Sequence, residues 1–258
     1  MTGVAQYAAL SRRAILNTFR QPAAIVPALL FPLLFLAMSA AAFERSTSLP
    51  GFPQVESFLQ FVIAATIVQG ALFGAVAAGA DMATDIEGGF FERLIASPVA
   101  RSSILVGRVM GAATLGFFQA LLYFGVAIAF GLHVAGGLPA VFMVALTAAV
   151  LSAGIGSITV AFALRTGSTE AVQGAFPLVF VVLFISSAFF PRELMGGWFK
   201  SAATLNPISH MIEGLRFLVI EGLSGPHFFT AFGISTAVLG VGLALAGRAL
   251  GGRLASRA

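Results

Sequence analysis

Two adjacent residues of opposite charge, Glu92 and Arg93, lie in the most charged stretch of an otherwise apolar chain. This stretch, Asp85–Gly107, reads DIEGGFFERLIASPVARSSILVG, whereas only 9% of the 258 residues are charged. In so apolar a protein, we expect charged side chains where water or a soluble protein meets the chain. The chemistry that these residue types predict is recognition of a partner protein, through charges together with apolar anchors.

The residues around the charge pair predict a short helix from Gly89 to Ser97. Apolar side chains accompany the charges within two turns, namely Phe90, Phe91, Leu94 and Ile95. Pro98 ends the helix because it disfavours the α conformation at the preceding residue, Ser97. Such a helix can insert into a groove of a soluble partner. It can equally lie on lipid as an amphipathic linker, and the residues alone leave both interpretations open.

No arrangement of side chains indicates catalysis or metal binding. The chain has no Cys, its three His form no HExxH motif, and its only Lys, Lys200, follows Phe199, so that no GxxxxGK[ST] phosphate loop exists. We therefore predict no catalytic residue, no metal site and no cofactor bound by this chain. A membrane-embedded enzyme is disfavoured, because no nucleophile–base constellation is visible in the sequence.

The composition predicts a membrane protein. Hydrophobic residues make up 59% of the chain and the mean hydropathy is +0.99, whereas a soluble domain carries about a quarter charged residues. The predicted fold class is an all-α integral membrane protein with six transmembrane helices. The apolar stretches long enough to span a bilayer, about 20 residues each, are Pro22–Phe43, Phe58–Ala80, Val109–Leu132, Leu138–Leu164, Ala171–Phe190 and His227–Gly247.

The distribution of basic residues predicts the orientation. An even number of spans places both termini on one side, and ten of the 14 Lys and Arg residues fall in segments on that side. By the positive-inside rule, both termini and the loop 81–108 are expected to be cytoplasmic, in a bacterial cytoplasmic (inner) membrane. The basic residues are dispersed rather than gathered in one stripe, so no nucleic-acid partner is expected.

Residues 1–21 are predicted to form an amphipathic helix on the membrane surface, and residues 22–258 a six-span domain. At 100° per residue, the helix has an apolar and a polar side. The apolar side carries Val4, Ala8, Ile15 and Phe19, and the polar side carries Gln6, Arg13, Asn17 and Arg20. We expect the apolar side to be buried among lipid headgroups, and the Arg side chains to meet anionic lipid.

The outer segment 191–226 is too long for a simple connection and too apolar for a solvated loop. It predicts two short helices that form a re-entrant hairpin, the first opening at Pro191. The second has Asn206 as its N-cap and Pro207 as its first residue. A seventh full span is disfavoured because Arg216 would lie in hydrocarbon. The residues that define this hairpin are Pro191, Trp198, Asn206, Pro207 and Arg216.

Ionisable residues are absent from the interior of the six predicted spans. Self-powered pumps usually need such groups as relays, so a self-powered secondary transporter or channel is the less favoured alternative. Polar residues within the spans can line a substrate path or form interhelical hydrogen bonds. The candidates for the path are Gln69, Gln119, Tyr123, Ser186 and Ser187. The GxxxG pairs at Gly70, Gly107 and Gly247 are no more frequent than chance gives with 29 Gly.

Two sequence motifs resemble those of a known family. Residues Glu92–Val99, ERLIASPV, with Arg101 and Gly107-Arg108 after them, resemble the E-R-L-x-x-[ST]-P signature of ABC-2-type permeases. Ser187–Pro191, SAFFP, followed by Trp198, Leu205-Asn206-Pro207 and Arg216, resembles a second motif of that family. The resemblance covers nearly the whole chain, and is nearest to daunorubicin-resistance and polysaccharide-export permeases. One departure is Gly88-Gly89, where a single Gly is usual.

The resemblance implies an ABC-2 (type V exporter-like) fold and the role of a transmembrane permease subunit in an ATP-driven exporter. It implies that two permeases, identical or paralogous, pair above two ATP-binding subunits that hold ATP and Mg. The cargo would be an amphipathic drug, lipid or lipid-linked glycan, with antibiotic resistance as one outcome. The residues implied to couple to the ATPase are Phe90, Phe91, Glu92, Arg93, Leu94, Ser97 and Pro98.

Overall fold

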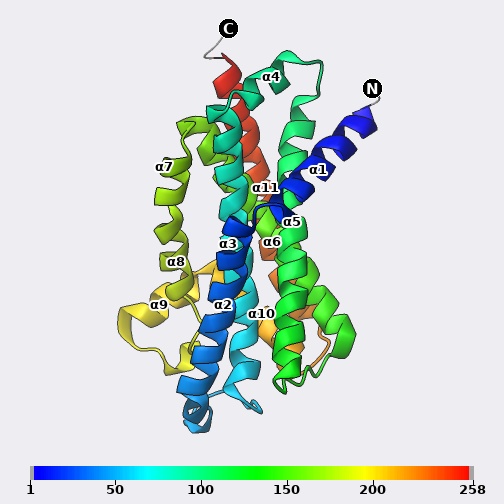
Figure 1. The fold of residues 1–258 in the computed structure, drawn as a ribbon. Helices are drawn as coiled ribbons and strands as arrows, with labels where there is room; N and C mark the ends of the chain where they lie inside the picture. The colour runs from blue at the N-terminus through cyan, green and yellow to red at the C-terminus, as the bar shows by residue number, and fades with distance from the viewer. Residues whose placement is uncertain (1–2, 256–258) are drawn as a thin grey trace.

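The computed structural model describes residues 3–255, apart from the side chain of Ala24, as a bundle of helices without strands (Figure 1). Both ends of this part of the chain and α4 lie toward one end of the bundle, here called the α4 end, and the 44–57 loop lies at the opposite end. The elements are α1 (Gly3–Phe19), α2 (Pro22–Phe43), η1 (Glu44–Ser48), α3 (Phe58–Glu87), α4 (Phe90–Ala96), α5 (Arg101–Ala129), α6 (Gly137–Thr166), α7 (Thr169–Gly174), α8 (Phe176–Phe184), η2 (Arg192–Leu194), α9 (Gly197–Leu205), α10 (Pro207–Ile220) and α11 (Gly225–Ala255).

Within the described residues, five helices are long and apolar enough to cross a membrane: Ile25–Ser48, which covers most of α2 and η1, together with α3, α5, α6 and α11. A helix of 30 residues, such as α3 or α6, is about 45 Å long, whereas the hydrocarbon core is about 30 Å thick. Their ends must therefore project beyond the hydrocarbon, which gives charged residues near those ends access to water. The all-α membrane fold that the sequence predicts is confirmed, and the sixth predicted span corresponds to a shorter apolar segment, Thr169–Phe184.

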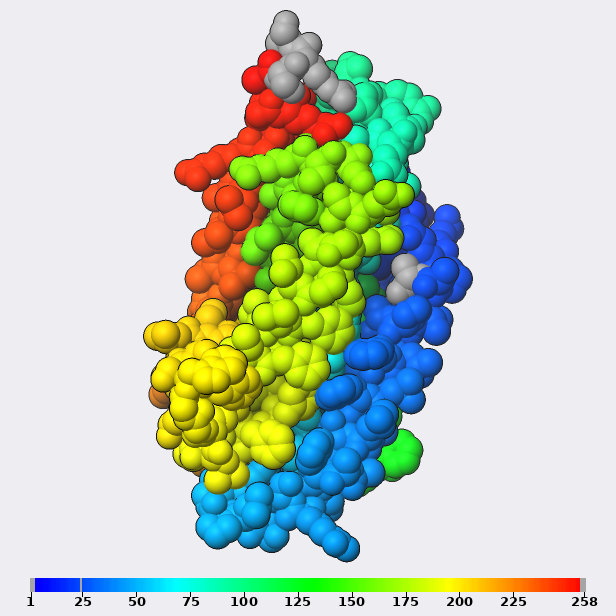
Figure 2. Space-filling view, turned by 90° about the vertical axis from the view of Figure 1, so that its left-hand side faces the viewer, coloured from blue at the N-terminus to red at the C-terminus, as the bar shows by residue number. Residues whose placement is uncertain are grey.

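That sixth segment is broken, which the sequence analysis did not anticipate. The predicted span Ala171–Phe190 is divided into α7, which ends at Gly174, and α8, which begins at Phe176. Pro177, the second residue of α8, has no backbone N–H to donate to the preceding turn. The helix ends at Phe184, before a turn that leads to η2. Figure 2 shows α7 and α8 running beside α2 on one face of the molecule.

The central helix of the bundle is α3, which packs against α2, α5, α6, α7 and α10. Most of its apolar length is buried, with Phe58, Phe61 and Ile63 among the fully enclosed side chains. By contrast, α2 and α11 lie at the periphery and leave most of their apolar surface open. On α2 the exposed residues include Leu30, Leu34 and Met38. Such surfaces suit lipid or another membrane subunit rather than water.

The N-terminal helix packs against the bundle in a way that corrects the expected orientation. A Cβ atom added to Gly107 of α5 would lie 2.7 Å from the Cβ of Leu10, and one added to Gly111 would lie 3.3 Å from the carbonyl oxygen of Ala14. This close crossing brings the side of α1 that carries Arg13 and Asn17 against α3 and α5. Arg13, which was expected to meet anionic lipid, thus pairs with Asp85 instead, although its side chain is 40% exposed and Arg20 is exposed as well.

The hairpin segment differs in one boundary from the prediction. Its first helix, α9, begins at Gly197 rather than at Pro191, which precedes only the short turn η2. The second helix begins as predicted, because the Asn206 side chain accepts a 2.9 Å hydrogen bond from the backbone N–H of Ile208, and Pro207 is the first helical residue. Most of α10 is buried against α3 and α11, whereas α9 leaves Trp198 on the surface.

Candidate functional site

The charged stretch forms a separate short helix because two glycines interrupt the chain before it. Gly88 ends α3, its N–H donating to the carbonyl oxygen of Thr84 over 2.9 Å. Gly89 has φ +68°, a left-handed conformation that residues with a side chain rarely adopt. The tandem glycines are thus the turn between α3 and α4. At the other end, Ser97 is extended, with φ −87° and ψ 156°, as the following Pro98 requires.

The apolar side of α4 is occupied by the chain itself. Phe91 is only 1% exposed and belongs to a buried cluster that includes Met82 of α3 and Leu250 of α11; Leu94 and Ile95 pack against that cluster. These positions are three and four residues apart and therefore share one side of the helix. Phe91, which was predicted to fill a groove on a partner, is consequently unavailable for that contact.

The opposite side of α4 remains accessible. Arg93 and Ala96 are exposed, as is Pro98 just beyond the helix, while Phe90 and Glu92 are half-buried. The guanidinium of Arg93 lies 5.9 Å from the centre of the Phe90 ring. Ser97 does not face outward for binding: its hydroxyl donates to the carbonyl oxygen of Leu94 over 2.6 Å. Arg93 is therefore accessible to a partner that approaches this end of the bundle.

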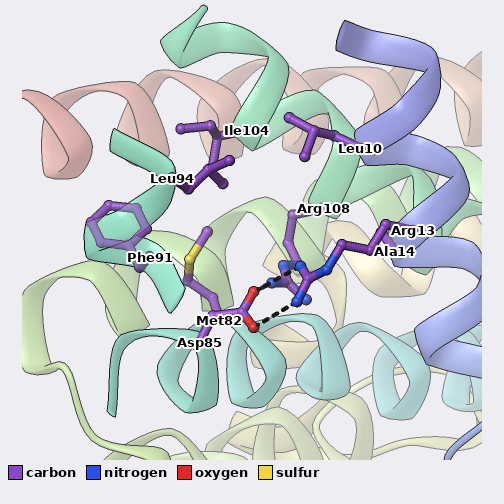
Figure 3. Close-up of a pocket in the computed structure, with 9 residues that line it drawn as sticks. All are labelled: Leu10, Arg13, Ala14, Met82, Asp85, Phe91, Leu94, Ile104 and Arg108. Atoms are coloured by element: carbon purple, nitrogen blue, oxygen red, sulfur yellow. Dashed lines mark hydrogen bonds and ion pairs between the residues drawn. The ribbon is translucent and has the colours of Figure 1, made fainter. Parts of the chain in front are cut away.

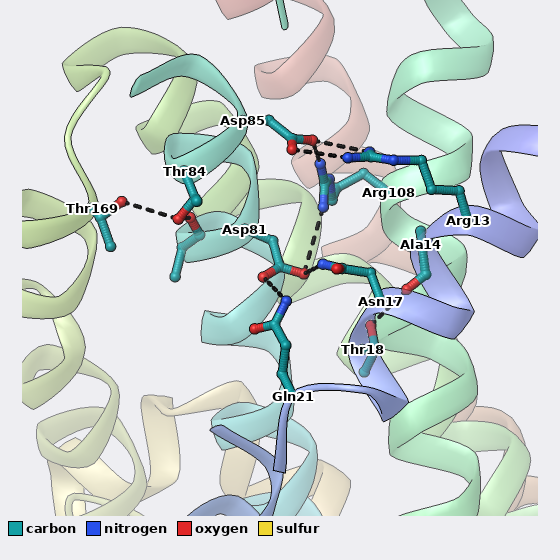
Figure 4. A network of polar contacts seen from close by, with 11 residues as sticks. Arg13, Ala14, Asn17, Thr18, Gln21, Asp81, Thr84, Asp85, Arg108 and Thr169 are labelled. Atoms are coloured by element: carbon teal, nitrogen blue, oxygen red, sulfur yellow. Dashed lines mark hydrogen bonds and ion pairs between the residues drawn. The ribbon is translucent and has the colours of Figure 1, made fainter. Parts of the chain in front are cut away.

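Next to α4, a network of charges joins α1 to α3 and α5 (Figure 4). Arg13 donates two hydrogen bonds to the carboxylate of Asp85, at 3.1 and 3.0 Å. Arg108 of α5 also donates to Asp85, and its other terminal nitrogen lies 3.5 Å from an Asp81 oxygen. The side chains of Arg108, Asp81 and Asp85 are mostly buried. Such charge-assisted bonds are stronger than bonds between neutral groups.

Asp81 continues the network toward the start of α2. Its two oxygens accept hydrogen bonds from the side chains of Asn17 and Gln21, each 3.1 Å long. Gln21 directly precedes Pro22, the first residue of α2. One carboxylate on α3 therefore holds both the end of α1 and the beginning of α2.

The same network touches α4. The Arg13 guanidinium lies 3.9 Å from the centre of the Phe90 ring, within cation–π range. Where α1, α3, α4 and α5 meet there is a small cavity of about 20 Å³ (Figure 3). Its lining brings Arg13 and Arg108 to one side and the apolar anchors Phe91 and Leu94 to the other. Movement of α4 would therefore disturb both the packing of its apolar side chains and the position of Arg13.

Sequence analysis missed Asp81, Asp85 and Arg108 as members of a site. The predicted second span ended at Ala80 and the third began at Val109, so these residues were assigned to the loop between them. A signal was nevertheless present, because Asp81 and Asp85 are four residues apart and must share one side of any helix that continues past Ala80. In the structure, α3 continues to Glu87 and α5 begins at Arg101.

A mainly apolar cleft of about 450 Å³ lies between α2, α3, α7 and α8. Four Phe rings line it, Phe31, Phe73, Phe176 and Phe180, and Gln173 is the one polar residue among the described side chains that line it. The Phe73 ring lies 4.9 Å from each of the rings of Phe176 and Phe180, measured between centres. Cavities of this volume accommodate drug-sized molecules, and this one takes apolar and aromatic groups.

Two of the predicted path residues have a structural task that the sequence did not reveal. Pro32, inside α2, cannot donate to the carbonyl of Ala28 four residues earlier. That carbonyl oxygen accepts instead from the Tyr123 hydroxyl at 3.0 Å and from the Gln119 side chain at 3.3 Å. Neighbouring helices commonly satisfy backbone groups that a proline frees in membrane helices.

The other predicted path residues are also enclosed within the subunit. Gln69, Ser186 and Ser187 are all at least 98% buried. Ser186 donates to the carbonyl of Leu183, and Ser187 donates two hydrogen bonds to Ser209 of α10, from its backbone N–H to the hydroxyl and from its own hydroxyl to the carbonyl oxygen. A substrate path lined by these residues would require the surrounding helices to separate.

Two of the three GxxxG pairs lie at helix crossings. Gly107 and Gly111 lie where α1 packs against α5. In the second pair, a Cβ atom on Gly74 would lie 2.8 Å from the Gln119 Oε1 of α5. Gly70 likewise faces the Tyr123 ring. Around Gly247 and Gly251, among the described residues, nothing lies within 4 Å of such an atom. The number of GxxxG pairs in the sequence does not indicate which of them lie at helix crossings.

Among the hairpin residues, Arg216 is buried, with only 5% of its surface exposed. Its guanidinium donates to the carbonyl oxygens of Phe61, Ser187 and Ala188, at 2.9, 2.9 and 3.2 Å, and stacks 3.6 Å from the centre of the Phe61 ring. Nearby, the Asn206 side chain donates to the carbonyls of Val182 and Ile185 at the end of α8. Together these bonds tie α10 to α3 and to the turn after α8.

The family model that matches this chain covers residues 5–220, which includes α4, the charge network, the cleft and most of the hairpin segment. Its description is ABC-2 type transporter. The chain belongs to this family. It is accordingly a multi-pass membrane protein and a transport permease, as the two sequence motifs predicted.

Curated relatives agree with this assignment. The chain is 28% identical to the daunorubicin resistance ABC transporter permease protein DrrB1 of Streptomyces coeruleorubidus, over 83% of this chain and 74% of that protein. It is 28% identical to a transport permease, ycf38, of Cyanophora paradoxa, over 81% and 72% respectively. It is 23% identical to the doxorubicin resistance ABC transporter permease protein DrrC of Mycobacterium tuberculosis, over 85% and 78%.

Proposed function

We propose that this chain is the permease subunit of an ATP-driven exporter and that α4 is its coupling helix. The observation that carries the proposal is the two-sided construction of α4. Phe91 and Leu94 anchor the helix in the bundle, while Arg93 points away from it. A helix fixed on one side and charged on the other suits the transfer of movement from a soluble subunit. ATP and Mg would be held by that subunit, in two copies per complex.

The α4 end of the bundle is assigned to the cytoplasm of a bacterial cell. The excess of Lys and Arg in the segments at this end supports the assignment. Both termini would then be cytoplasmic, and the segment from Pro191 to Pro226 would face the outer side. Exposed α9, with Trp198 at its surface, suits the outer membrane–water interface, where Trp is enriched.

The cleft between α2, α3 and α8 is the proposed route for an apolar or aromatic part of the cargo. Besides the four Phe rings of the cleft, the adjoining surfaces of α2 and α8 expose Leu34, Leu178 and Val181. A second permease, identical or paralogous, would cover these surfaces and close the cleft against lipid. Anthracycline drugs carry both planar aromatic rings and polar groups, and two relatives bear such drugs in their names. An amphipathic drug is therefore the first cargo to test.

The decisive experiment is purification of the tagged chain from its native membrane, followed by reconstitution in vesicles. We expect an ATP-binding subunit to co-purify in equal number with the permease, and doxorubicin, a fluorescent probe, to accumulate in inside-out vesicles only with ATP. Recovery of the ATPase without doxorubicin transport would retain the exporter and reject this cargo. Transport by the chain alone, driven by a proton gradient, would replace the exporter with a secondary transporter.

The orientation can be tested because the chain contains no Cys. In intact cells, we expect Ser48→Cys and Ser201→Cys, both at exposed positions, to react with an impermeant maleimide. Ser97→Cys should react only after the membrane is permeabilised. Labelling of Ser97→Cys in intact cells would invert the proposed orientation. A similar probe at Ser256 lies outside the residues that the structure describes.

A further inference from the structure

The last two turns of α3 carry three carboxylates that hold different helices. As described above, Asp81 binds Gln21 at the start of α2, and Asp85 binds Arg13 of α1. The third, Glu87, faces α7: its two oxygens accept from the backbone N–H and the hydroxyl of Thr169, at 2.7 and 3.0 Å. A carboxylate at a helix N-terminus is favourably placed, because the exposed N–H groups there carry partial positive charge.

These attachments lead to opposite walls of the Phe-lined cleft. On one side, Asp81 and Asp85 fix α1 and the beginning of α2, whose Phe31 lines the cleft. On the other side, Glu87 fixes the first residue of α7, and Gln173 of α7 and Phe176 of α8 line the facing wall. The floor of the cleft is α3 itself, from Phe73 to Ala80. Both walls of the cleft are thus tied to one segment at the end of α3.

This segment is also continuous with α4. Only Gly88 and Gly89 separate Glu87 from Phe90, and the Arg13 guanidinium bridges the junction by contacting both Asp85 and Phe90. A displacement of α4 therefore acts on α1 directly, and on α2 and α7 through the end of α3. Packed elements of this kind can carry coupling between two sites when each has more than one arrangement.

We propose that Asp81, Asp85 and Glu87 are positioning residues of the transport cycle, which link the position of α4 to the width of the cleft. Asp81 and Asp85 position the α2 wall, and Glu87 positions the α7–α8 wall. Arg13 completes the link on the α1 side. The inference rests on the proposed function, because it requires an ATPase that moves α4.

The test uses a thiol reporter in the cleft, so it requires no knowledge of the cargo. Ala77 of α3 lines the cleft and is half-buried, and Ala77→Cys introduces a small side chain into a chain without Cys. In the complex with its ATPase subunit, the rate of reaction with N-ethylmaleimide is compared with and without ATP and vanadate. We expect this rate to differ by about fivefold or more between the two states, a usual size for coupled sites.

Variants on either wall should remove this response while the complex stays assembled. In the reporter background, Arg13→Gln, Asp85→Asn and Glu87→Ala should each reduce the difference to roughly twofold or less. The double variant Arg13→Gln with Asp85→Asn should lose less than the sum of the two single variants, since both single variants break the Arg13–Asp85 contact that they share. The matched controls are Arg12→Gln and Glu170→Ala. Each removes a charge of the same sign as the tested residue from an exposed position, next to Arg13 and next to Thr169 respectively, and should leave the response unchanged.

The outcomes separate this inference from the proposed function. If no ATPase subunit co-purifies with the unaltered chain, the proposed function fails. If the complex forms and Ala77→Cys gives the same rate in both states, or if Arg13→Gln responds like Arg12→Gln, only the inference is overturned. Should Arg13→Gln fail to fold, Arg13→Lys retains the charge but cannot donate to both carboxylate oxygens while it stacks on Phe90. A full response of the folded Arg13→Lys variant would contradict the proposal.

Discussion

Replacement of Arg216 by Met is expected to destabilise the folded chain by about 3–5 kcal/mol, because three buried carbonyl groups lose their donor. Arg216 is 5% exposed and donates to Phe61, Ser187 and Ala188. Met has a similar apolar stem but no donor, so the substitution isolates the loss of the hydrogen bonds from the loss of volume. Thermal unfolding of the detergent-solubilised protein, followed by size-exclusion chromatography, measures the effect.

Two variants define what the result means. Arg216→Lys can place one ammonium among the carbonyls but cannot reproduce the planar fork of donors, so an intermediate loss is expected. Lys200→Ala removes an exposed cation from α9 and should leave the unfolding temperature unchanged. If Arg216→Met unfolded at the same temperature as Lys200→Ala, the three carbonyl contacts would not stabilise the bundle.

The same residue shows where sequence reasoning about the fold succeeds and where it stops. Helical spacing predicts one apolar face on α10, formed by Ile208, Ile212, Leu215 and Val219, and all four residues are buried in the structure. Arg216 argues against a seventh full span, since an isolated charge in hydrocarbon is costly. What the sequence does not display is that α3 and the turn after α8 present their carbonyl oxygens to it. Partners distant in sequence decide whether a charge can be buried.

The N-terminal helix illustrates a related limit. Its boundaries and its two-sided pattern were evident from periodicity, but the pattern does not state which side meets the protein. Arg13 and Asn17 face α3 because Asp85 and Asp81 lie opposite them. Those carboxylates were assigned to a loop because a span of about 20 residues ended at Ala80. Because α3 continues beyond the hydrocarbon, Asp81 and Asp85 belong to a helix rather than to a loop. This position places them beside their partners on α1.

Two of the polar residues that the sequence places inside the spans have roles that depend on the backbone of another helix. Tyr123 and Gln119 bind the carbonyl of Ala28 that Pro32 leaves without a donor. The proline in α2 and the polar pair in α5 could each be read from the sequence. Their pairing depends on how the two helices cross.

For α4, the motif in the sequence identified the helix but not the direction of its side chains. Phe91 is buried, so it packs in the permease's own core rather than against a partner.

This division of α4 predicts two distinct ways to disconnect the ATPase. Truncation of a buried Phe to Ala costs about 3–5 kcal/mol, and α4 is only seven residues long, so Phe91→Ala should release α4 locally without unfolding the bundle. Arg93→Glu should leave α4 in place and instead repel its binding partner. Loss of a charge contact that excludes water costs about 2–5 kcal/mol, which lowers affinity by about thirtyfold or more. Both variants should lose the ATPase subunit on purification.

Hydrogen exchange of the backbone amides of residues 90–96 distinguishes the two causes. Exchange should accelerate in Phe91→Ala, because the anchor that holds α4 against Met82 and Leu250 is gone, and should be unchanged in Arg93→Glu. Arg101→Glu is the matched control: it reverses an exposed charge in the same region but outside α4, and should retain the ATPase subunit. Full retention of that subunit by Arg93→Glu would show that the exposed side of α4 is not the contact. Unchanged exchange in Phe91→Ala would show that the apolar cluster does not hold α4.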